Sequence, residues 1–207
     1  MKKTIITASL AFLISTVAQA QDFTVIKNTK GATLGYSTAS GVKILTVNGK
    51  KFKDLNKNGK LDKYEDWRLS ADERAKDLAS KLSVEEIAGL MLYSRHQALP
   101  GGVSGYNMGT YGGKVFPEAV NVKASDLSDQ QKAFLKDDNL RHVLLTKVQS
   151  PEVAAVWNNN IQSFVEGIGF GIPANNSTDP RHTATVTSEF NAGAGGQISM
   201  WPDGLGM

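Results

Sequence analysis

The chain has 207 residues and a composition typical of a globular protein, with 41% hydrophobic and 21% charged residues, which excludes fibrous and disordered classes. Its formal net charge of +3 falls to +1 without Lys2 and Lys3. The basic residues are scattered, so no nucleic-acid partner is expected. Cysteine is absent, which excludes a disulfide framework and a lipidated cysteine. Stability must come from burial or from a metal.

Residues 1–20 predict a secretory signal peptide. Two lysines are followed by an apolar run over residues 5–14 and by small residues at Ala18 and Ala20, the pattern of an export signal. The run is too short to span a bilayer. We expect cleavage after Ala20, a periplasmic or secreted location, and no membrane anchor after cleavage. The alternative is a short buried N-terminal helix, but the run lacks amphipathic spacing.

Residues 21–69 are predicted to form an N-terminal extension with a small β-element. A partly alternating, β-rich run covers residues 42–47 and is followed by Asn48 and Gly49. Asn-Gly is the dipeptide best suited to a type I′ turn between two antiparallel strands. The sequence therefore predicts a β-hairpin at this point.

Residues 54–65 fit a twelve-residue calcium loop. Oxygen-bearing side chains occupy the first, third, fifth and ninth places, with Gly at the sixth and Glu at the twelfth, as a hard cation with six to eight oxygen ligands requires. The predicted ligands are Asp54, Asn56, Asn58, the backbone carbonyl of Lys60, Asp62 and Glu65. The asparagines and nearby lysines predict modest affinity. The alternative is a metal-free turn rich in Asp and Asn that caps the next helix. Either role is structural, and no cofactor is expected for catalysis.

Two helices are predicted after this loop, because residues 70–73 and 83–86 both have capping-box spacing. Their apolar stripes are expected to pack on a core. The stripes are formed by Ala75, Leu78, Ala79 and Leu82 in the first helix, and by Ile87, Leu90 and Met91 in the second.

Residues 97–127 are rich in glycine and have no sustained period, so they predict a long loop or insertion over one face. Its aromatic residues Tyr106, Tyr111 and Phe116 either line a binding site or pin the loop to the domain. We favour pinning.

The next segment predicts a strand, a helix and a second strand. Capping-box spacing over 128–131 indicates a short helix, residues 140–147 read as a buried strand, and Ser150-Pro151 begin a longer helix. The expected inner face of that helix is Val153, Val156, Trp157, Ile161 and Phe164. A compact apolar run then leads into a polar loop, so a parallel βαβ unit is predicted. Strands that deliver polar side chains at their carboxyl ends build the ligand sites of α/β barrels.

Several segments of the last third resemble glycoside hydrolase family 3, the β-glucosidase-type exo-acting enzymes. They are Trp157–Gln162, Gly171-Ile172-Pro173, Asp179-x-x-His182, Phe190–Gly193 and Ser199–Pro202. Residues 82–91 are also similar to the helix that leads into the family's first barrel strand. The resemblance implies that residues 70–207 are the N-terminal portion of a barrel domain. The expected fold is an α/β incomplete (β/α)₈ TIM barrel, because a complete one needs about 250 residues.

The resemblance implies a secreted retaining exo-β-glycosidase that hydrolyses terminal β-linked sugars from oligosaccharides or glucosides. Asp179 matches the carboxylate that binds hydroxyls of the sugar in the −1 subsite, and Arg181 and His182 lie beside it in the sequence. Alternatively, Asp179 caps a turn before Pro180, and His182 is a packed, hydrogen-bonded histidine.

Catalysis by a retaining glycosidase needs a nucleophile and a general acid about 5 Å apart. The family places both carboxylates at positions that would follow Met207, so we expect this chain to hold no catalytic residue and to be inactive alone. The alternative function is a calcium-stabilised secreted carbohydrate-binding module. A dockerin-like module is disfavoured, because dockerins carry two calcium loops and this chain has one.

Overall fold

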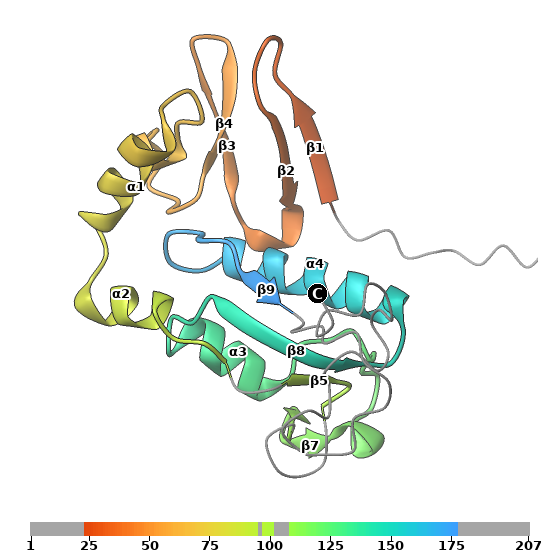
Figure 1. Cartoon of the computed structure of the whole chain (residues 1–207). Coiled ribbons are helices and arrows are strands. Elements are labelled where there is room, and N and C mark those ends of the chain that lie inside the picture. The colour runs from red at the N-terminus through yellow and green to blue at the C-terminus, as the bar shows by residue number, and fades with distance from the viewer. Residues whose placement is uncertain (1–22, 95–96, 102–107, 178–207) are drawn as a thin grey trace, which may run out of the picture.

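The computed structural model describes residues 23–94, 97–101 and 108–177. Two β-hairpins form one end of the molecule, and a parallel sheet flanked by helices forms the other (Figure 1). The predicted signal peptide, Tyr106 and every residue after Ser177 lie outside the described ranges. No helix in the described ranges has the length and apolar character needed to cross a membrane.

The first hairpin joins β1 (Phe23–Lys27) to β2 (Thr33–Ser37), and the second joins β3 (Lys43–Val47) to β4 (Lys50–Asp54). A short 3₁₀ helix, η1 (Thr38–Ser40), lies between them. The second hairpin is the one predicted from the sequence. Asn48 and Gly49 have φ values of 50° and 73°, which is the positive-φ pair of a type I′ turn.

The calcium-loop-like segment leads into a second 3₁₀ helix, η2 (Lys63–Glu65), and then into helices α1 (Ala71–Ala79) and α2 (Val84–Leu90). Both predicted capping boxes are confirmed, because Ser70 and Ser83 accept hydrogen bonds from the backbone N–H three residues later. The predicted packing of the apolar stripes is wrong for Ala75 and Ala79 of α1, which are exposed, and for Ile87 and Met91 of α2. Ile87 is 40% exposed and Met91 is 82% exposed, because the described residues contact the opposite side of this helix.

A three-stranded parallel sheet carries the rest of the fold. Its strand order is β5 (Gln97–Leu99), β8 (His142–Val148) and β9 (Asn175–Ser177). Leu145 of β8 pairs with Gln97, and Leu144 pairs with Ser177. The predicted βαβ order is confirmed, because β8, helix α4 (Pro151–Glu166) and the parallel strand β9 follow one another in the chain. The position of the second strand was wrong: the apolar run over residues 169–173 is not a strand, since Gly169 and Gly171 have φ values of 53° and 65°, and the strand lies in the polar residues that follow.

The segment predicted as a continuous loop contains regular structure. Residues 97–99 form strand β5, and a small hairpin of β6 (Thr110–Tyr111) and β7 (Lys114–Val115) precedes the 3₁₀ helix η4 (Phe116–Glu118). Three residues are too few to show a period, which is why the sequence pattern did not reveal β5. Tyr111 is buried and meets Phe116 edge to face at 5.6 Å. This contact lies within the segment itself, and Tyr106 lies outside the described residues, so the pinning role stays a prediction.

Helices α3 (Asp129–Lys136) and α4 cover one face of the sheet and enclose the main core. The buried core side chains are Leu99, Leu127, Leu135, Leu140, Val143, Leu145, Val148, Trp157, Ile161 and Val165. The prediction for α4 was right for Trp157 and Ile161, which are buried, and for Val153 and Phe164, which are partly buried against the core. Val156, however, is 39% exposed, and Val165 takes an inner position instead. The observed α/β architecture agrees with the predicted fold class, and a partial barrel remains a prediction.

Candidate functional site

The carboxyl edge of the parallel sheet is where the predicted sugar site would lie. Strands β5, β8 and β9 end at Leu99, Val148 and Ser177. Asp179 follows the end of β9 by two residues in the sequence, but it lies outside the described ranges, as do Arg181 and His182. The structure thus supplies the strand that leads to the predicted site, and the three side chains themselves remain untested.

The alternation of side chains along β8 and β9 identifies the two faces of the sheet. Val143 and Leu145 point into the helix-covered core with Trp157. On β9, Asn176 donates from Nδ2 to Oδ1 of Asn158 in α4 at 2.5 Å. Because successive residues of a strand point to opposite faces, the neighbours of these residues occupy the face away from the helices.

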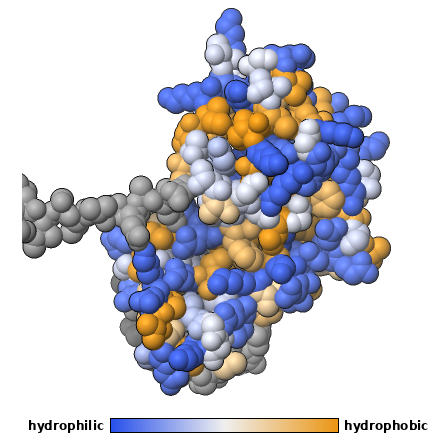
Figure 2. Space-filling model, turned by 180° about the vertical axis from the view of Figure 1, so that it is seen from behind, coloured by the Kyte–Doolittle hydropathy of each residue, from blue (hydrophilic) through white to orange (hydrophobic). Residues whose placement is uncertain are grey.

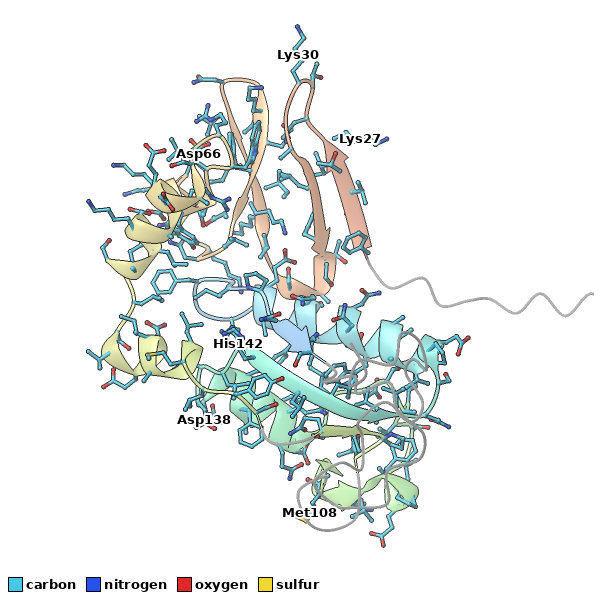
Figure 3. All side chains as sticks on the ribbon, viewed as in Figure 1. Lys27, Lys30, Asp66, Met108, Asp138 and His142 are labelled. Carbon is cyan, nitrogen blue, oxygen red and sulfur yellow. The ribbon has the colours of Figure 1, made fainter. Side chains whose placement is uncertain are left out.

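That other face carries polar pairs between strands. The hydroxyl groups of Tyr93 and Ser177 form a hydrogen bond, and Asn175 Nδ2 lies 3.1 Å from Nδ1 of His142. An amide NH₂ group can only donate, so Nδ1 of His142 is the acceptor in this pair. His142 stands at the start of β8 (Figure 3). Both pairs lie on the face of the sheet that α3 and α4 do not cover.

Sequence analysis gave none of these four residues a role. The one unusual feature was the composition of β9, whose residues Asn175, Asn176 and Ser177 are all polar although the strand lies in a parallel sheet. Parallel strands buried on both faces are usually apolar throughout.

Arg141 anchors the start of β8 beneath this face. It is 5% exposed, and its guanidinium donates to the carbonyl oxygens of Leu135, Leu140 and Ile172 at 2.6–3.0 Å. Burial lowers the pKa of this group. Its bonds tie the turn before β8 to the segment that leads into β9, so its role is to position the strands.

The calcium-loop-like segment folds around its two outer carboxylates. Asp54, which is fully buried, accepts the N–H groups of Asn58 and Gly59 at 3.0 and 2.9 Å. Glu65 accepts three further loop N–H groups, from Leu55, Asn56 and Asp62, at 2.7–3.3 Å. Burial raises the pKa of Glu65 against the effect of these hydrogen bonds.

The middle ligand positions are tied to one another. Asn56 and Asn58 both donate from Nδ2 to Oδ2 of Asp62, and Lys81 Nζ lies 3.1 Å from its other oxygen. Lys60, at the seventh place of the loop, whose carbonyl was a predicted ligand, donates its N–H to Asn58 Oδ1. Within residues 23–177 as described, no group of three or more His, Asp or Glu side chains is arranged to hold a metal ion. Asp62 and Glu65 also form a capping box at the start of η2, and calcium binding by this segment stays a prediction.

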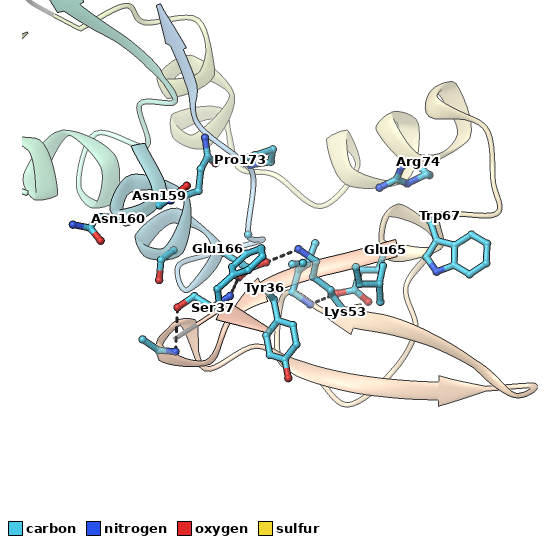
Figure 4. A pocket seen from close by; sticks show the side chains of 18 residues that line it. Tyr36, Ser37, Lys53, Glu65, Trp67, Arg74, Asn159, Asn160, Glu166 and Pro173 are labelled. Carbon is cyan, nitrogen blue, oxygen red and sulfur yellow. Dashed lines mark hydrogen bonds and ion pairs between the residues drawn. The ribbon is translucent and has the colours of Figure 1, made fainter. Parts of the chain in front are cut away.

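A cavity of about 500 Å³ lies between the hairpins and α4, away from the carboxyl edge (Figure 4). Across it, Lys53 Nζ lies 2.5 Å from Glu166 Oε1, and Glu166 Oε2 accepts the N–H of Ser37 at 3.1 Å. Lys57 also donates to the carbonyl oxygen of Gly167 at 2.6 Å. Seen from behind, apolar surface gathers over the hairpins and is bordered by hydrophilic residues (Figure 2). These contacts join the N-terminal extension to the helix that follows β8.

The sequence is similar to curated β-glucosidases. It is 34% identical over 173 residues to a periplasmic beta-glucosidase/beta-xylosidase of Dickeya chrysanthemi, a match that covers 81% of this chain and 23% of that protein. It is 27% identical over 146 residues to a probable beta-glucosidase C of Aspergillus oryzae, and 29% identical over 158 residues to beta-glucosidase C of Emericella nidulans. These two matches cover 70% and 74% of this chain, and 20% and 22% of the fungal proteins.

No protein-family profile matches the sequence. The chain spans about a fifth to a quarter of the length of the relatives it matches. The matches therefore identify relatives over most of this chain, while most of each relative has no counterpart in it.

Proposed function

The chain belongs to the β-glucosidase-like glycoside hydrolases of family 3, and we propose that it is the N-terminal part of a secreted retaining exo-β-glycosidase. In this proposal the whole enzyme removes terminal β-linked sugars from oligosaccharides or glucosides. This part supplies the first strands of the barrel and one wall of the −1 subsite, while the nucleophile and the general acid lie in the part that follows Met207. The chain alone is then inactive.

The observation that carries the proposal is the parallel order β5, β8, β9, with β9 ending two residues before Asp179. Tyr93, His142, Asn175 and Ser177 form a polar layer on the face away from α3 and α4. A strand that continued for two more residues would carry position 179 on the same face as Asn175 and Ser177, because side chains alternate. We infer that Asp179 binds sugar hydroxyls there through charge-assisted hydrogen bonds. Arg181 and His182 are proposed to border the same subsite.

The test is a completed enzyme, made by joining this chain at Met207 to the part of the Dickeya chrysanthemi protein that follows its matched region. We expect it to hydrolyse an aryl β-glucoside, whereas the chain alone gives no turnover. Asp179→Ala should lower kcat/KM of the completed enzyme by about 10²-fold or more, since each charge-assisted hydrogen bond contributes about 1.5–3 kcal/mol.

The matched control is Asp72→Ala, which removes an exposed carboxylate in the first turn of α1 and should leave kcat/KM within about twofold. An unchanged kcat/KM in the Asp179 variant would contradict the proposed subsite. If the chain alone bound cellobiose in a calorimeter and the completed protein gave no turnover, the binding-module alternative would replace the enzyme proposal.

We also propose that residues 54–65 bind a structural calcium ion. The loop backbone has the required sharp turn at Gly59, with φ of 77°, and the oxygens of Asp54 and Glu65 retain lone pairs beyond those used by loop N–H groups. Asn56, Asn58, Asp62 and the Lys60 carbonyl would complete the ligand set. Lys81 opposes binding, because it already pairs with Asp62. We therefore expect weak affinity, suited to calcium levels outside the cytoplasm.

Thermal unfolding in millimolar calcium and in excess chelator tests this second proposal. We expect calcium to raise the Tm of the chain by about 5 °C, which corresponds to roughly 2 kcal/mol for a domain of this size. The calcium-induced shift should disappear in Asp54→Asn and persist in the control Asp72→Asn. Equal Tm values with and without calcium would leave the metal-free turn as the correct description.

A further inference from the structure

The N-terminal extension carries most of the positive charge of the protein. Residues 23–69 contain 10 basic and 4 acidic residues, a net charge of +6, whereas residues 70–207 contain 11 basic and 15 acidic residues, a net charge of −4. Within the two hairpins the imbalance is complete, because residues 23–53 contain six lysines and no acidic residue. The small net charge of the whole chain therefore hides a division between a basic extension and an acidic remainder.

Four of these lysines gather where the hairpins turn, at the end of the hairpins that is farthest from the parallel sheet (Figure 1). Lys27 ends β1, and Lys30 lies in the turn that follows (Figure 3). Lys50 and Lys51 begin β4. The two turns touch, because Lys50 Nζ donates to the carbonyl oxygen of Lys30 at 3.5 Å. We refer to these four residues as the lysine patch.

The lysine patch rests on a fixed framework. Asn28 links the hairpins by accepting the N–H of Lys51 at 2.7 Å and donating to its carbonyl oxygen at 3.1 Å. Trp67 Nε1 donates to the same oxygen at 3.0 Å, and a Cβ placed on Gly31 would lie 2.4 Å from the Trp67 ring. The indole thus packs on the first turn, and Lys50 Nζ lies 5.4 Å from its ring centroid. A backbone that is already ordered lowers the entropic cost of binding a ligand.

No carboxylate of the described residues neutralises the lysine patch. The ion pairs found within the described ranges involve Lys53, Arg68 and Lys81, and none involves a member of the patch. The side chains of Lys27 and Lys30 are exposed. Clustered charges of one sign create a potential that attracts ligands of the opposite sign, so the hairpin turns present a surface suited to a polyanion.

The residues between the lysines indicate which class of polyanion fits. The turns comprise residues 28–33 in the first hairpin and Asn48-Gly49 in the second, and neither has a large apolar side chain. Surfaces that bind membranes combine basic residues with large apolar side chains that enter the lipid. Here Thr29, Thr33 and Asn48 are exposed instead, and their hydroxyl and amide groups can both donate and accept hydrogen bonds. Sugar hydroxyls need such partners.

We propose that the lysine patch binds an acidic polysaccharide through the carboxylates of its uronic acid residues. The ammonium groups form charge-assisted hydrogen bonds with these carboxylates, and the neighbouring threonine and asparagine side chains meet the sugar hydroxyls. The surface lies at the hairpin turns and not at the carboxyl edge of the parallel sheet. The inference is therefore independent of the proposed glycosidase site, and the chain alone is sufficient to test it.

The test measures the Kd of the chain for polygalacturonate immobilised on a sensor surface. The control ligand is fully methyl-esterified polygalacturonate, which has the same backbone and no charge. We expect binding to the first polymer and none to the second. The Kd should rise about tenfold or more between about 0.1 M and 1 M NaCl, because the screening length falls from about 10 Å to about 3 Å.

A double variant then locates the surface. Lys27→Gln combined with Lys30→Gln should weaken binding about tenfold, since one lysine near an anionic surface contributes a factor of about five in affinity. The matched control, Lys76→Gln combined with Lys114→Gln, removes the same charge from exposed positions on α1 and β7 and should keep Kd within about twofold. Both double variants should keep Tm within about 2 °C of the parent chain, because all four side chains are exposed.

Three results would overturn the proposal. Equal binding to the charged and the esterified polymers would show that the lysines do not recognise carboxylates. Equal weakening in the two double variants would show an effect of net charge without a defined surface. Tighter binding to duplex DNA, or to vesicles of equal parts phosphatidylglycerol and phosphatidylcholine, than to polygalacturonate would assign the patch to a different class of partner.

Discussion

The ion pair between Lys53 and Glu166 joins parts of the chain that are 113 residues apart in sequence, and its removal should loosen the N-terminal extension. We consider the double-mutant cycle of Lys53→Met and Glu166→Gln. The Gln side chain retains an oxygen to accept the Ser37 N–H, which lies 3.1 Å from Glu166 Oε2 in the parent chain. The cycle therefore isolates the charge interaction.

The expected coupling follows from distance and exposure. Nζ and Oε1 are 2.5 Å apart, and the two side chains are 26% and 12% exposed. Fully exposed pairs contribute about 0.2–1 kcal/mol, and hydrogen bonds to charged groups contribute about 1.5–3 kcal/mol. A pair that is mostly but not fully buried should lie between these ranges, so we expect a coupling energy of about 1–2 kcal/mol.

Urea unfolding followed by tryptophan fluorescence is a suitable assay, because Trp67 lies beside the hairpins and Trp157 lies in the main core. The Glu166→Gln variant should shift the urea midpoint to lower concentration. Lys76→Met on α1 removes an exposed lysine and should change the free energy of unfolding by less than about 0.5 kcal/mol. A coupling energy below about 0.5 kcal/mol would refute the reasoning, since the pair would then be no stronger than an ordinary surface contact.

Three further substitutions test other parts of the structure. Gly89→Ala should gain about 1 kcal/mol of helix propensity, but the added Cβ would lie 2.4 Å from the Asp138 carbonyl oxygen, and this contact should cost more than the gain. Urea unfolding should therefore show a net loss of stability of about 1–2 kcal/mol. A net gain would contradict the close packing. Hydrogen bonding, first from the Gly113 N–H, lowers the pKa of Asp129 below its model-peptide value of 3.8. The ionised Asp129 carboxylate therefore stabilises the folded chain fully above pH 3.8, and this stabilisation is lost as the pH falls through the folded-state pKa. Asp129→Asn should accordingly lower the free energy of unfolding at pH 7 and not in strong acid. A loss that is equal at every pH would be inconsistent with this assignment. Gly49→Ala should lower the free energy of unfolding in urea by about 1 kcal/mol, because φ is 73° at that position. Gly49→Asn should be nearly neutral. Equal losses for both variants would argue against a strained turn.

Local signals in the sequence predicted the elements that depend on neighbouring residues. The serines at positions 70, 83 and 128 begin helices because each hydroxyl accepts a hydrogen bond from an N–H three residues later. Asn48 and Gly49 form the predicted turn because only a few residue types tolerate positive φ. The buried strand β8 and the helix α4 were also predicted, since each is long enough to show its period.

The sequence also carried the family resemblance, which the curated relatives confirm. The residues it pointed to most directly, Asp179, Arg181 and His182, follow the end of β9. Their proposed role depends on the side-chain alternation of β9, which lies in the polar residues after the apolar run that was expected to form the strand.

The tertiary structure decided which surfaces meet. Strand β5 has three residues and exists because its backbone pairs with β8, a long-range contact that no local pattern encodes. Lys53 and Glu166 come together because the hairpins pack on α4. Likewise, Val84, Ile87 and Met91 have the spacing of a core-facing stripe, and only the packing of Gly89 on the turn before β8 turned that stripe outward. Periodicity determines that a helix has an apolar side, but the position of its neighbours determines whether that side is buried within the chain.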